Sequence, residues 1–441
     1  MTTIETAMER WNLPGMVVGV LRNGDITVET YGVRSRETGE PVLPDTIYGI
    51  GSISKVFTAT LAMRLVQAGK LDLDQPVIEI MPELALANPE ARATVTMRHL
   101  LTHTSGFAGD GFLENGNGEE ALQEYVNTFG GLDQVSRPGR WWSYNNNALG
   151  LAGAVAARVA GTTYETAMRT YVLDPLGLER TGFGQPPVLP NAAAGYEFGA
   201  DGSPEPRDIG GTARSVNPAG GLLSTVPDLL RFGAYHLGIM ADGQDVFLPD
   251  DLRLEMQATQ ATVNGYEAWG IGWGKKLEGG SVWTIEHGGW YNGFRAQLTL
   301  IPEANEALAI LTTGPHGHAA IEEVQEALLR DAFGVPDVEL KPVPVADEQL
   351  DRLVGTYLQS HMHVVIERAG EGAIRMLLKT KWHGEANDAP LECPLVPVSD
   401  HEFVVTEGEF LNSRLVFLLD DAGEVEAVRV LSRICLPAAG S

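Results

Sequence analysis

Strand-like segments occur at two distant places in the first three quarters of the chain, and this arrangement most constrains the fold. Two apolar runs within residues 15–33 flank an Asn-Gly turn, which is the pattern of a β-hairpin. Four further strand-like runs occupy residues 268–314, and a helical pattern follows at 319–333. The intervening residues, roughly 71–268, are rich in helix and turn signals. We therefore expect one antiparallel sheet built from both ends of this region, with a helical insert.

The last quarter of the chain has a different pattern. Residues 334–347, GVPDVELKPVPVAD, contain three prolines and no hydrophobic periodicity, which is typical of a linker. Short runs that alternate polar and apolar residues follow, and the DDAG segment at 420–423 marks a hairpin turn. We predict an α+β domain at 1–334, a linker at 335–347 and a small all-β barrel or sandwich at 348–441.

Charge and apolar content indicate which classes of partner and which cell compartment suit this chain. The chain has 31 Lys and Arg against 58 Asp and Glu, a formal net charge of −27, and this field repels nucleic-acid phosphates and anionic lipid headgroups. The N-terminus lacks a signal-peptide pattern, and the longest apolar stretch, 148–157, is too short to span a bilayer. We therefore expect a cytoplasmic protein that binds neither nucleic acid nor membranes, and homo-oligomerisation stays open. The two cysteines, Cys393 and Cys435, either pair or remain free thiols.

A serine and a lysine lie one helical turn apart in GSISKVFTATLAMRLVQAG. Ser52 and Lys55 are predicted to share one face at the start of an amphipathic helix that ends near Gly69. A serine hydroxyl becomes nucleophilic when a neighbouring base takes its proton, and desolvation or a nearby cation can keep a lysine amine neutral for that purpose. The alternative is an N-cap serine followed by a solvated lysine. Ser54 is a weaker candidate because no lysine follows it three residues later.

Two further segments carry groups suited to acyl transfer. PGRWWSYNNNALGLAG places Tyr144 and Asn146 between a Pro-Gly turn and an apolar helix. The tyrosine can relay protons as phenol or phenolate, and the asparagine amide can hold both Lys55 and a substrate amide. SVWTIEHGGWYNGF runs a strand into His287 and two glycines, which mark a close approach of a backbone or ligand. His287 can exchange a proton near neutral pH, and the backbone N–H of Trp290 can complete an oxyanion hole.

These segments together resemble a known family. GSISK, HLLTHTSGF, PGRWWSYNNNALGLAG, NPAGGLLSTVPDLLRF and EHGGWYNGF, in this order, are similar to the motifs of the serine β-lactamase and penicillin-binding-protein superfamily, in its class C-like branch of carboxylesterases and D-aminopeptidases. The resemblance covers about residues 8–330. It implies a nucleophile, its base, a second element and a substrate-binding third element, which are Ser52, Lys55, Tyr144 with Asn146, and His287-Gly288-Gly289. The backbone N–H groups of Ser52 and Trp290 would form the oxyanion hole.

The resemblance implies a serine hydrolase that forms an acyl-enzyme and cleaves ester bonds, or amide and peptide bonds, of a small molecule or short peptide without a cofactor. Class C β-lactamases have a lysine where this chain has His287, so we expect weak or no β-lactamase activity. The alternatives are a penicillin-binding-type thioesterase or acyltransferase that passes an acyl or peptidyl group to an amine, and a non-catalytic binding protein. The C-terminal region is similar to the lipocalin-like domains appended to several such hydrolases, where they cap the cleft or mediate assembly.

Several other residues near these segments are expected to have structural roles. They are Tyr125 and Asn127, which share the Tyr-x-Asn spacing within an ordinary helical pattern, and His99 and His103. The pairs His316/His318 and His361/His363 lack an obvious third ligand, so we expect no metal site. Tryptophans close to the motifs are compatible with an aromatic-walled cleft or with core packing; they are Trp141, Trp142, Trp269, Trp273 and Trp290.

Overall fold

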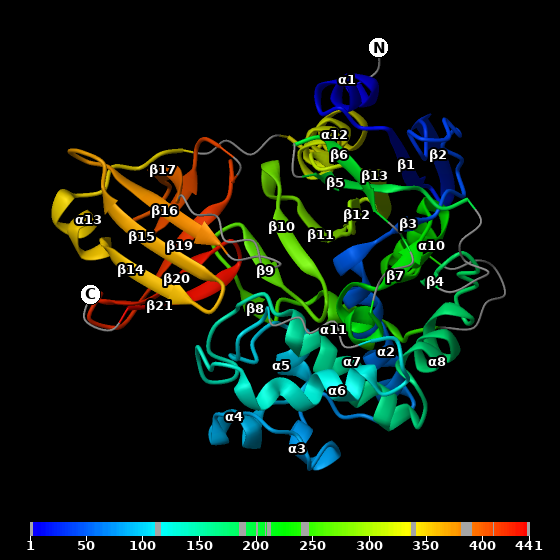
Figure 1. Ribbon diagram of the computed structural model, residues 1–441, viewed down its shortest axis with the longest axis horizontal. Helices are drawn as coiled ribbons and strands as arrows, with labels where there is room; N and C mark the ends of the chain where they lie inside the picture. The colour runs from blue at the N-terminus through cyan, green and yellow to red at the C-terminus, as the bar shows by residue number, and fades with distance from the viewer. Residues whose placement is uncertain are drawn as a thin grey trace.

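The computed structural model describes residues 3–110, 116–184, 191–199, 202–207, 209, 213–239, 247–336, 341–380, 390–408 and 410–438. In this part of the chain, a large antiparallel sheet is flanked by helices, and a closed β-barrel lies beside it (Figure 1). The predicted α+β fold is therefore confirmed. In Figure 1 the barrel is on the left, and most helices of the insert lie below the sheet.

The main sheet joins the two ends of the first region. Its strand order is β2-β1-β13-β12-β11-β10-β9-β8. The bounds are β1 Gly15–Arg22, β2 Asp25–Gly32, β8 Ala261–Thr262, β9 Glu267–Trp269, β10 Gly274–Leu277, β11 Trp283–Tyr291, β12 Phe294–Ile301 and β13 Glu306–Thr313. Between β1 and β2, Asn23 and Gly24 have φ values of 53° and 85°, as a two-residue hairpin turn requires. The predicted hairpin and the pairing of distant segments are confirmed, because β1 lies directly against β13.

Helices cover both faces of this sheet. On one face, α10 (Val226–Leu237) packs against β1, β12 and β13. On the other face, α1 (Thr3–Arg10) and α12 (Gly317–Phe333) form a separate core with alternate residues of β1 and β13. Strand β12 is buried along its whole length, although Arg295, Gln297 and Thr299 alternate with its apolar residues, and these three polar side chains are hydrogen-bonded.

The insert contains most of the helices. They are α2 Ser54–Gln67, α3 Val77–Ile80, α4 Pro89–Thr94, α5 Met97–Leu101, α6 Ala121–Asn127, α7 Asn146–Ala160, α8 Tyr164–Met168, α9 Asn217–Gly220 and α11 Asp250–Gln257. Two small sheets were not predicted; they are formed by β3 Tyr48–Gly49, β7 Leu222–Ser224 and β4 Gly182–Phe183, and by β5 Gly195–Phe198 and β6 Pro204–Arg207. No helix within the described ranges has the length and apolar character needed to cross a membrane.

Helix α2 differs from the prediction in two respects. It begins at Ser54, after a 3-10 turn over Gly51–Ile53 that contains Ser52. It is also not amphipathic, since every residue from Ser54 to Met63 is buried. Helices α7 and α9 pack against it, so no face remains for solvent over these residues. The helix ends at Gln67, and Gly69 follows with a φ of 65°.

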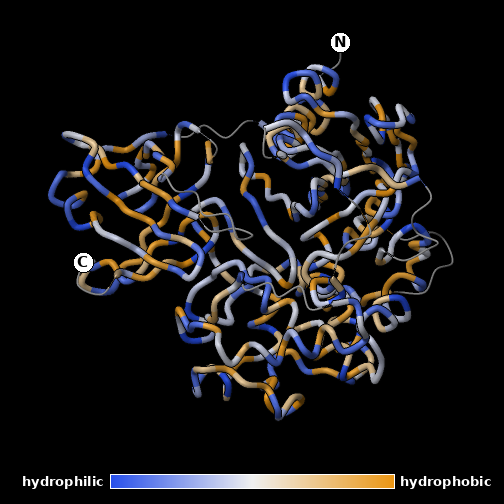
Figure 2. The backbone as a smooth tube through the Cα atoms, viewed as in Figure 1, coloured by the Kyte–Doolittle hydropathy of each residue, from blue (hydrophilic) through white to orange (hydrophobic). Residues whose placement is uncertain are grey.

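The C-terminal region forms a closed eight-stranded barrel, which fits a lipocalin-like domain. Its strands are β14 Gly355–Gln359, β15 Met362–Arg368, β16 Ile374–Thr380, β17 Leu391–Pro397, β18 Glu402–Val405, β19 Arg414–Leu419, β20 Val425–Val430 and β21 Arg433–Pro437. Hydropathy changes repeatedly along these strands, as expected for alternating inward and outward residues (Figure 2). Both cysteines, Cys393 and Cys435, are buried in the barrel core, and no disulfide joins them.

A short helix precedes the barrel. Helix α13 (Asp347–Leu353) was not predicted, and it contributes Leu350 and Leu353 to the barrel core. Residues 337–340 of the expected linker at 335–347 lie outside the described residues.

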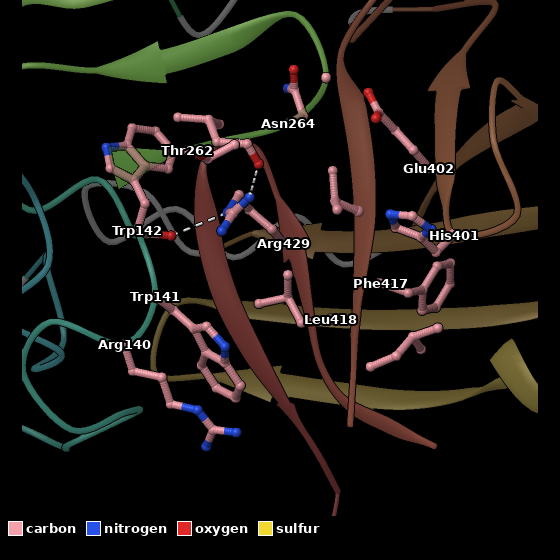
Figure 3. A pocket seen from close by; sticks show the side chains of 14 residues that line it. Arg140, Trp141, Trp142, Thr262, Asn264, His401, Glu402, Phe417, Leu418 and Arg429 are labelled. Atoms are coloured by element: carbon pink, nitrogen blue, oxygen red, sulfur yellow. Dashed lines mark hydrogen bonds between the residues drawn. The ribbon is translucent and has the colours of Figure 1, made fainter. Parts of the chain in front are cut away.

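The barrel contacts the first domain through β20, β21 and the turn between them. Arg429 donates hydrogen bonds to the carbonyl oxygens of Trp142, at 3.1 Å, and Val263 (Figure 3). In the turn, the Ser432 carbonyl accepts a hydrogen bond from the backbone N–H of Tyr144 at 2.8 Å. A cavity of about 570 Å³ lies beside this contact, with walls from both parts of the chain. The barrel therefore reaches the loop that leads into α7.

Candidate active site

Ser52 and Lys55 form the centre of the candidate active site. Lys55 Nζ lies 2.9 Å from Ser52 Oγ and donates a 2.7 Å hydrogen bond to the carbonyl oxygen of Ala219, on α9. Ser52 is half-buried, whereas Lys55 is 1% exposed. The alternative of a solvated lysine is therefore wrong, because α7 and α9 close over this part of α2.

The environment of Lys55 favours a neutral amine. Burial lowers its pKa well below the ordinary value of 10.5, the charge of Arg433 lowers it further, and Asp110 partly opposes these effects. A neutral amine that gives one proton to the Ala219 carbonyl keeps a lone pair for the hydroxyl of Ser52. The geometry thus fits a lysine that acts as a general base.

Tyr144 lies over Lys55. The ring centroid of Tyr144 is 4.9 Å from Lys55 Nζ, and its hydroxyl forms a hydrogen bond with Ser52. Burial raises the pKa of Tyr144, although the hydrogen bond with Ser52 and the charge of Arg433 oppose this effect. Of the two forms left open by the sequence, the structure favours the neutral phenol, which can accept and pass on a proton.

Aromatic side chains surround Tyr144. The His103 ring lies 4.5 Å from that of Tyr144, and Trp269 lies 5.9 Å from it. His103 has a φ of 57° and its Nδ1 accepts a hydrogen bond from the backbone N–H of Asn145 at 3.0 Å. His103 therefore supports the loop that carries Tyr144, which agrees with its expected structural role.

Asn146 has a different partner from the expected one. It is the first residue of α7, and its amide nitrogen donates a 2.9 Å hydrogen bond to Asp110 Oδ1. The Asn146 amide nitrogen is bound to Asp110, which precedes it by 36 residues, and the hydrogen bonds of Lys55 go to Ser52 and Ala219. That Asn146 also holds Lys55 stays a prediction.

Asp110 also binds the barrel. Arg433 forms an ion pair with both carboxylate oxygens of Asp110, at 2.6 and 3.0 Å, and both side chains are buried. The guanidinium carbon of Arg433 lies 4.7 Å from the centroid of the Tyr144 ring. Sequence reasoning missed both residues, since no local pattern distinguishes an arginine on a β-strand more than 300 positions from its carboxylate.

His287 is held neutral beside the site. It is 5% exposed, and its Nδ1 lies 2.7 Å from the carbonyl oxygen of Gly288, so Nδ1 carries the proton. Burial and the nearby Lys55 lower the pKa of His287 to about 3. The prediction that it exchanges a proton near neutral pH is wrong, because a buried imidazole without an anionic partner stays uncharged.

The two glycines after His287 allow strand β11 to lie against the turn that carries Ser52. A Cβ at Gly289 would lie 1.9 Å from the carbonyl oxygen of Ile50 and 3.2 Å from the backbone nitrogen of Ser52. A Cβ at Gly51, which has a φ of 48°, would lie 2.6 Å from the backbone nitrogen of Trp290. The backbones expected to supply the oxyanion hole are therefore in direct contact. Gly288 is exposed on the same strand.

The other residues singled out in the sequence have hydrogen-bond partners away from Ser52 and Lys55. Ser54 Oγ accepts a hydrogen bond from the backbone N–H of Leu222 at 3.0 Å, so it is a structural serine. His99 forms a capping box with Thr96 on α5, and the Tyr125 hydroxyl donates to Asn147.

Trp142 and Trp269 pack edge-on against His103, and Trp269 also packs edge-on against Tyr144. Trp273 stacks on Phe232 in the core, and Trp141 lines the cavity beside the barrel. Trp290 is 51% exposed, and its Nε1 donates a hydrogen bond to Glu197. The described residues include no group of three or more metal-ligating side chains.

Comparisons with known proteins agree with this geometry. A family model described as Beta-lactamase matches residues 2–331. Penicillin-binding protein 4 of Amycolatopsis lactamdurans is 32% identical over 368 residues, which cover 78% of this chain and 93% of that protein. Esterase EstB of Burkholderia gladioli is 31% identical over 306 residues, which cover 61% of this chain and 76% of that protein.

The likeness to a solved structure extends over the barrel as well. The crystal structure of SurE with D-Leu aligns with 99% of this chain and 98% of its own, with a TM-score of 0.78 and 24% sequence identity. At this identity the alignment shows a shared fold, in which the barrel follows the larger domain as it does here.

Proposed function

The chain belongs to the beta-lactamase family, and we propose that it is a serine hydrolase that forms a covalent acyl-enzyme at Ser52 and cleaves esters of small molecules or short peptides. The observation that carries the proposal is the 2.9 Å contact between Ser52 Oγ and a buried Lys55 amine. Burial lowers the pKa of this amine, which favours the neutral form that can accept the proton of the hydroxyl.

The remaining groups fit the steps of acyl transfer. Ser52 Oγ attacks the carbonyl carbon as its proton moves to Lys55, and the oxyanion receives the backbone N–H groups of Ser52 and Trp290. Tyr144, hydrogen-bonded to Ser52, passes the proton to the leaving group, whose bond to the acyl carbon then breaks. Water attacks the acyl-enzyme in the second half of the reaction and releases the acid.

The neutral His287 supports esters or amides over β-lactams as substrates. A lysine at this position would offer a permanent cation to a substrate carboxylate, whereas His287, with a pKa of about 3, offers none near pH 7. We therefore propose that cephalosporin hydrolysis is weak relative to ester hydrolysis. A panel of p-nitrophenyl esters, D- and L-amino-acid amides and a chromogenic cephalosporin measures this order directly.

A burst experiment tests the acyl-enzyme. With a p-nitrophenyl ester, the wild type should release about one equivalent of p-nitrophenol rapidly if deacylation is the slower step, and mass mapping should place the acyl group on Ser52. Ser52→Ala should lose both signals, while Ser54→Ala serves as the matched control because that hydroxyl bonds to the backbone of Leu222. Unchanged turnover in Ser52→Ala would refute the proposal.

The acceptor of the acyl group is a separate question with its own measurement. The same acyl-enzyme can react with water or with an amine. A peptidyl thioester is offered to the enzyme, and linear and cyclic products are separated by chromatography. Cyclic product would identify the acyltransferase alternative, whereas only linear product supports the hydrolase.

A further inference from the structure

The barrel places one charged side chain beside the catalytic groups. Arg433, the first residue of β21, is 7% exposed and forms its two-point ion pair with Asp110, which is 6% exposed. Asp110 in turn accepts the amide of Asn146. The adjacent Ser432 carbonyl holds the backbone N–H of Tyr144.

We propose that the barrel is part of the catalytic apparatus: Arg433 and Asp110 act as a positioning pair that orients Tyr144 and Asn146 beside Ser52 and Lys55. The inference rests on the proposed function of Ser52 and goes beyond it, because it assigns a catalytic contribution to the C-terminal domain. Neither residue touches Ser52 in this arrangement, so both act through other groups.

The distances make the electrostatic part of the effect large enough to measure. Arg433 Cζ and Lys55 Nζ lie 4.7 and 4.9 Å from the same Tyr144 ring centroid, so the two cationic groups are at most about 10 Å apart. At that separation and an effective dielectric constant of about 20, one charge shifts the titration of another by roughly one pH unit. Asp110 acts on Lys55 in the opposite direction.

The other titratable groups around this pair are few in the part of the chain described. Besides the ion pair, three titratable side chains lie around Lys55: Tyr144, His103 and His287. The pKa values of both histidines are lowered. From the barrel, His361 also faces Asp110. Tyr125 on α6 also faces Asp110, and Cys435 on β21 faces Arg433. Arg433 and Asp110 are therefore the charged groups whose removal is expected to change the pKa of Lys55.

Removing the charge of Arg433 and removing the charge of Asp110 should shift the pH dependence of acylation in opposite directions. Arg433→Met removes the cation, so the acid limb of the acylation rate, which follows deprotonation of Lys55, should move up by roughly one pH unit. Asp110→Asn keeps an oxygen acceptor for Asn146 but removes the anion, so the limb should move down. In the double variant Asp110→Asn/Arg433→Met, the acid limb should lie close to that of the wild type. The acylation rate itself should be slower, because the positioning of Tyr144 is lost.

The experiment measures burst acylation by a p-nitrophenyl ester against pH in all three variants and the full-length wild type. Arg429→Met is the matched control, because Arg429 docks the same barrel through the carbonyls of Trp142 and Val263. It should leave the acid limb in place. Shifts of the same sign in Asp110→Asn and Arg433→Met, or an equal shift in Arg429→Met, would overturn the proposal.

A second readout is independent of turnover. In Ser52→Ala protein labelled with ¹³Cε-lysine, the NMR titration of Lys55 should move upward in Arg433→Met and downward in Asp110→Asn. If the wild type neither hydrolyses the ester nor gains an acyl group on Ser52, the proposed hydrolase fails, while this titration still decides whether the pair acts on Lys55. An unmoved Lys55 resonance in both variants, with a normal wild-type burst, would refute the inference alone.

Discussion

Replacing Lys55 by methionine should remove a pH-dependent part of the free energy of unfolding. The amine is 1% exposed, and burial lowers its pKa well below 10.5 in the folded protein. In the unfolded chain the amine is solvated and stays protonated up to its ordinary pKa. Between these two values the unfolded state binds one more proton than the folded state. The stability of the wild type therefore rises with pH across this window, and the variant lacks that rise.

The size of the effect follows from one proton. A difference of one bound proton changes the free energy of unfolding by about 1.4 kcal/mol per pH unit. For each pH unit between the lowered pKa of folded Lys55 and its ordinary value of 10.5, the wild type should thus gain about 1.4 kcal/mol relative to Lys55→Met. The variant also leaves the Ala219 carbonyl without its donor, which costs about 1–3 kcal/mol at every pH and does not affect the slope.

Urea unfolding at a series of pH values measures this difference, and other titrating groups cancel when the two proteins are subtracted. Ser52→Ala is the control, since it keeps the amine and should follow the wild-type slope. The difference in the free energy of unfolding between the wild type and Lys55→Met could instead stay constant with pH below 10.5. That outcome would mean that Lys55 has the same charge in the folded and the unfolded protein. That result would refute its assignment as a neutral base.

Three further changes test other parts of the site. Tyr144→Phe removes the hydroxyl bonded to Ser52 and should slow burst acylation by about 10²–10⁴-fold, measured by stopped flow, with little change in thermal unfolding. His287→Gln should leave the pH profile of acylation unchanged between about pH 5 and about pH 8, because the pKa of His287 is about 3 and its ring is already neutral there; an inflection near pH 6.5 that disappears in the variant would contradict this. Gly289→Ala places a Cβ 1.9 Å from the Ile50 carbonyl oxygen, so we expect a lower melting temperature and loss of acylation. Wild-type values for both measurements would show that β11 does not need this close approach.

Local patterns predicted the parts of this protein that depend on neighbours in the chain. The Asn23-Gly24 turn adopts positive φ values that few other residue pairs tolerate, so the hairpin could be read from its letters. The three-residue spacing of Ser52 and Lys55 brings both side chains to one side of a helical turn, whether that turn is 3-10 or α. The alternating runs after residue 348 predicted the barrel strands for the same reason, since side chains alternate between two faces.

Only the tertiary structure decided the charges and partners in the site. The sequence left Lys55 either solvated or neutral, and the packing of α7 and α9 around α2 settled this by removing water from the amine. His287 was expected to titrate near pH 7, but burial beside Lys55 lowers its pKa. The ion pair of Arg433 with Asp110 joins two domains, and it exists because the β20–β21 turn docks against the loop before α7. Spacing along a chain determines which side chains are neighbours in a turn, whereas desolvation and long-range contacts depend on what the rest of the fold packs around them.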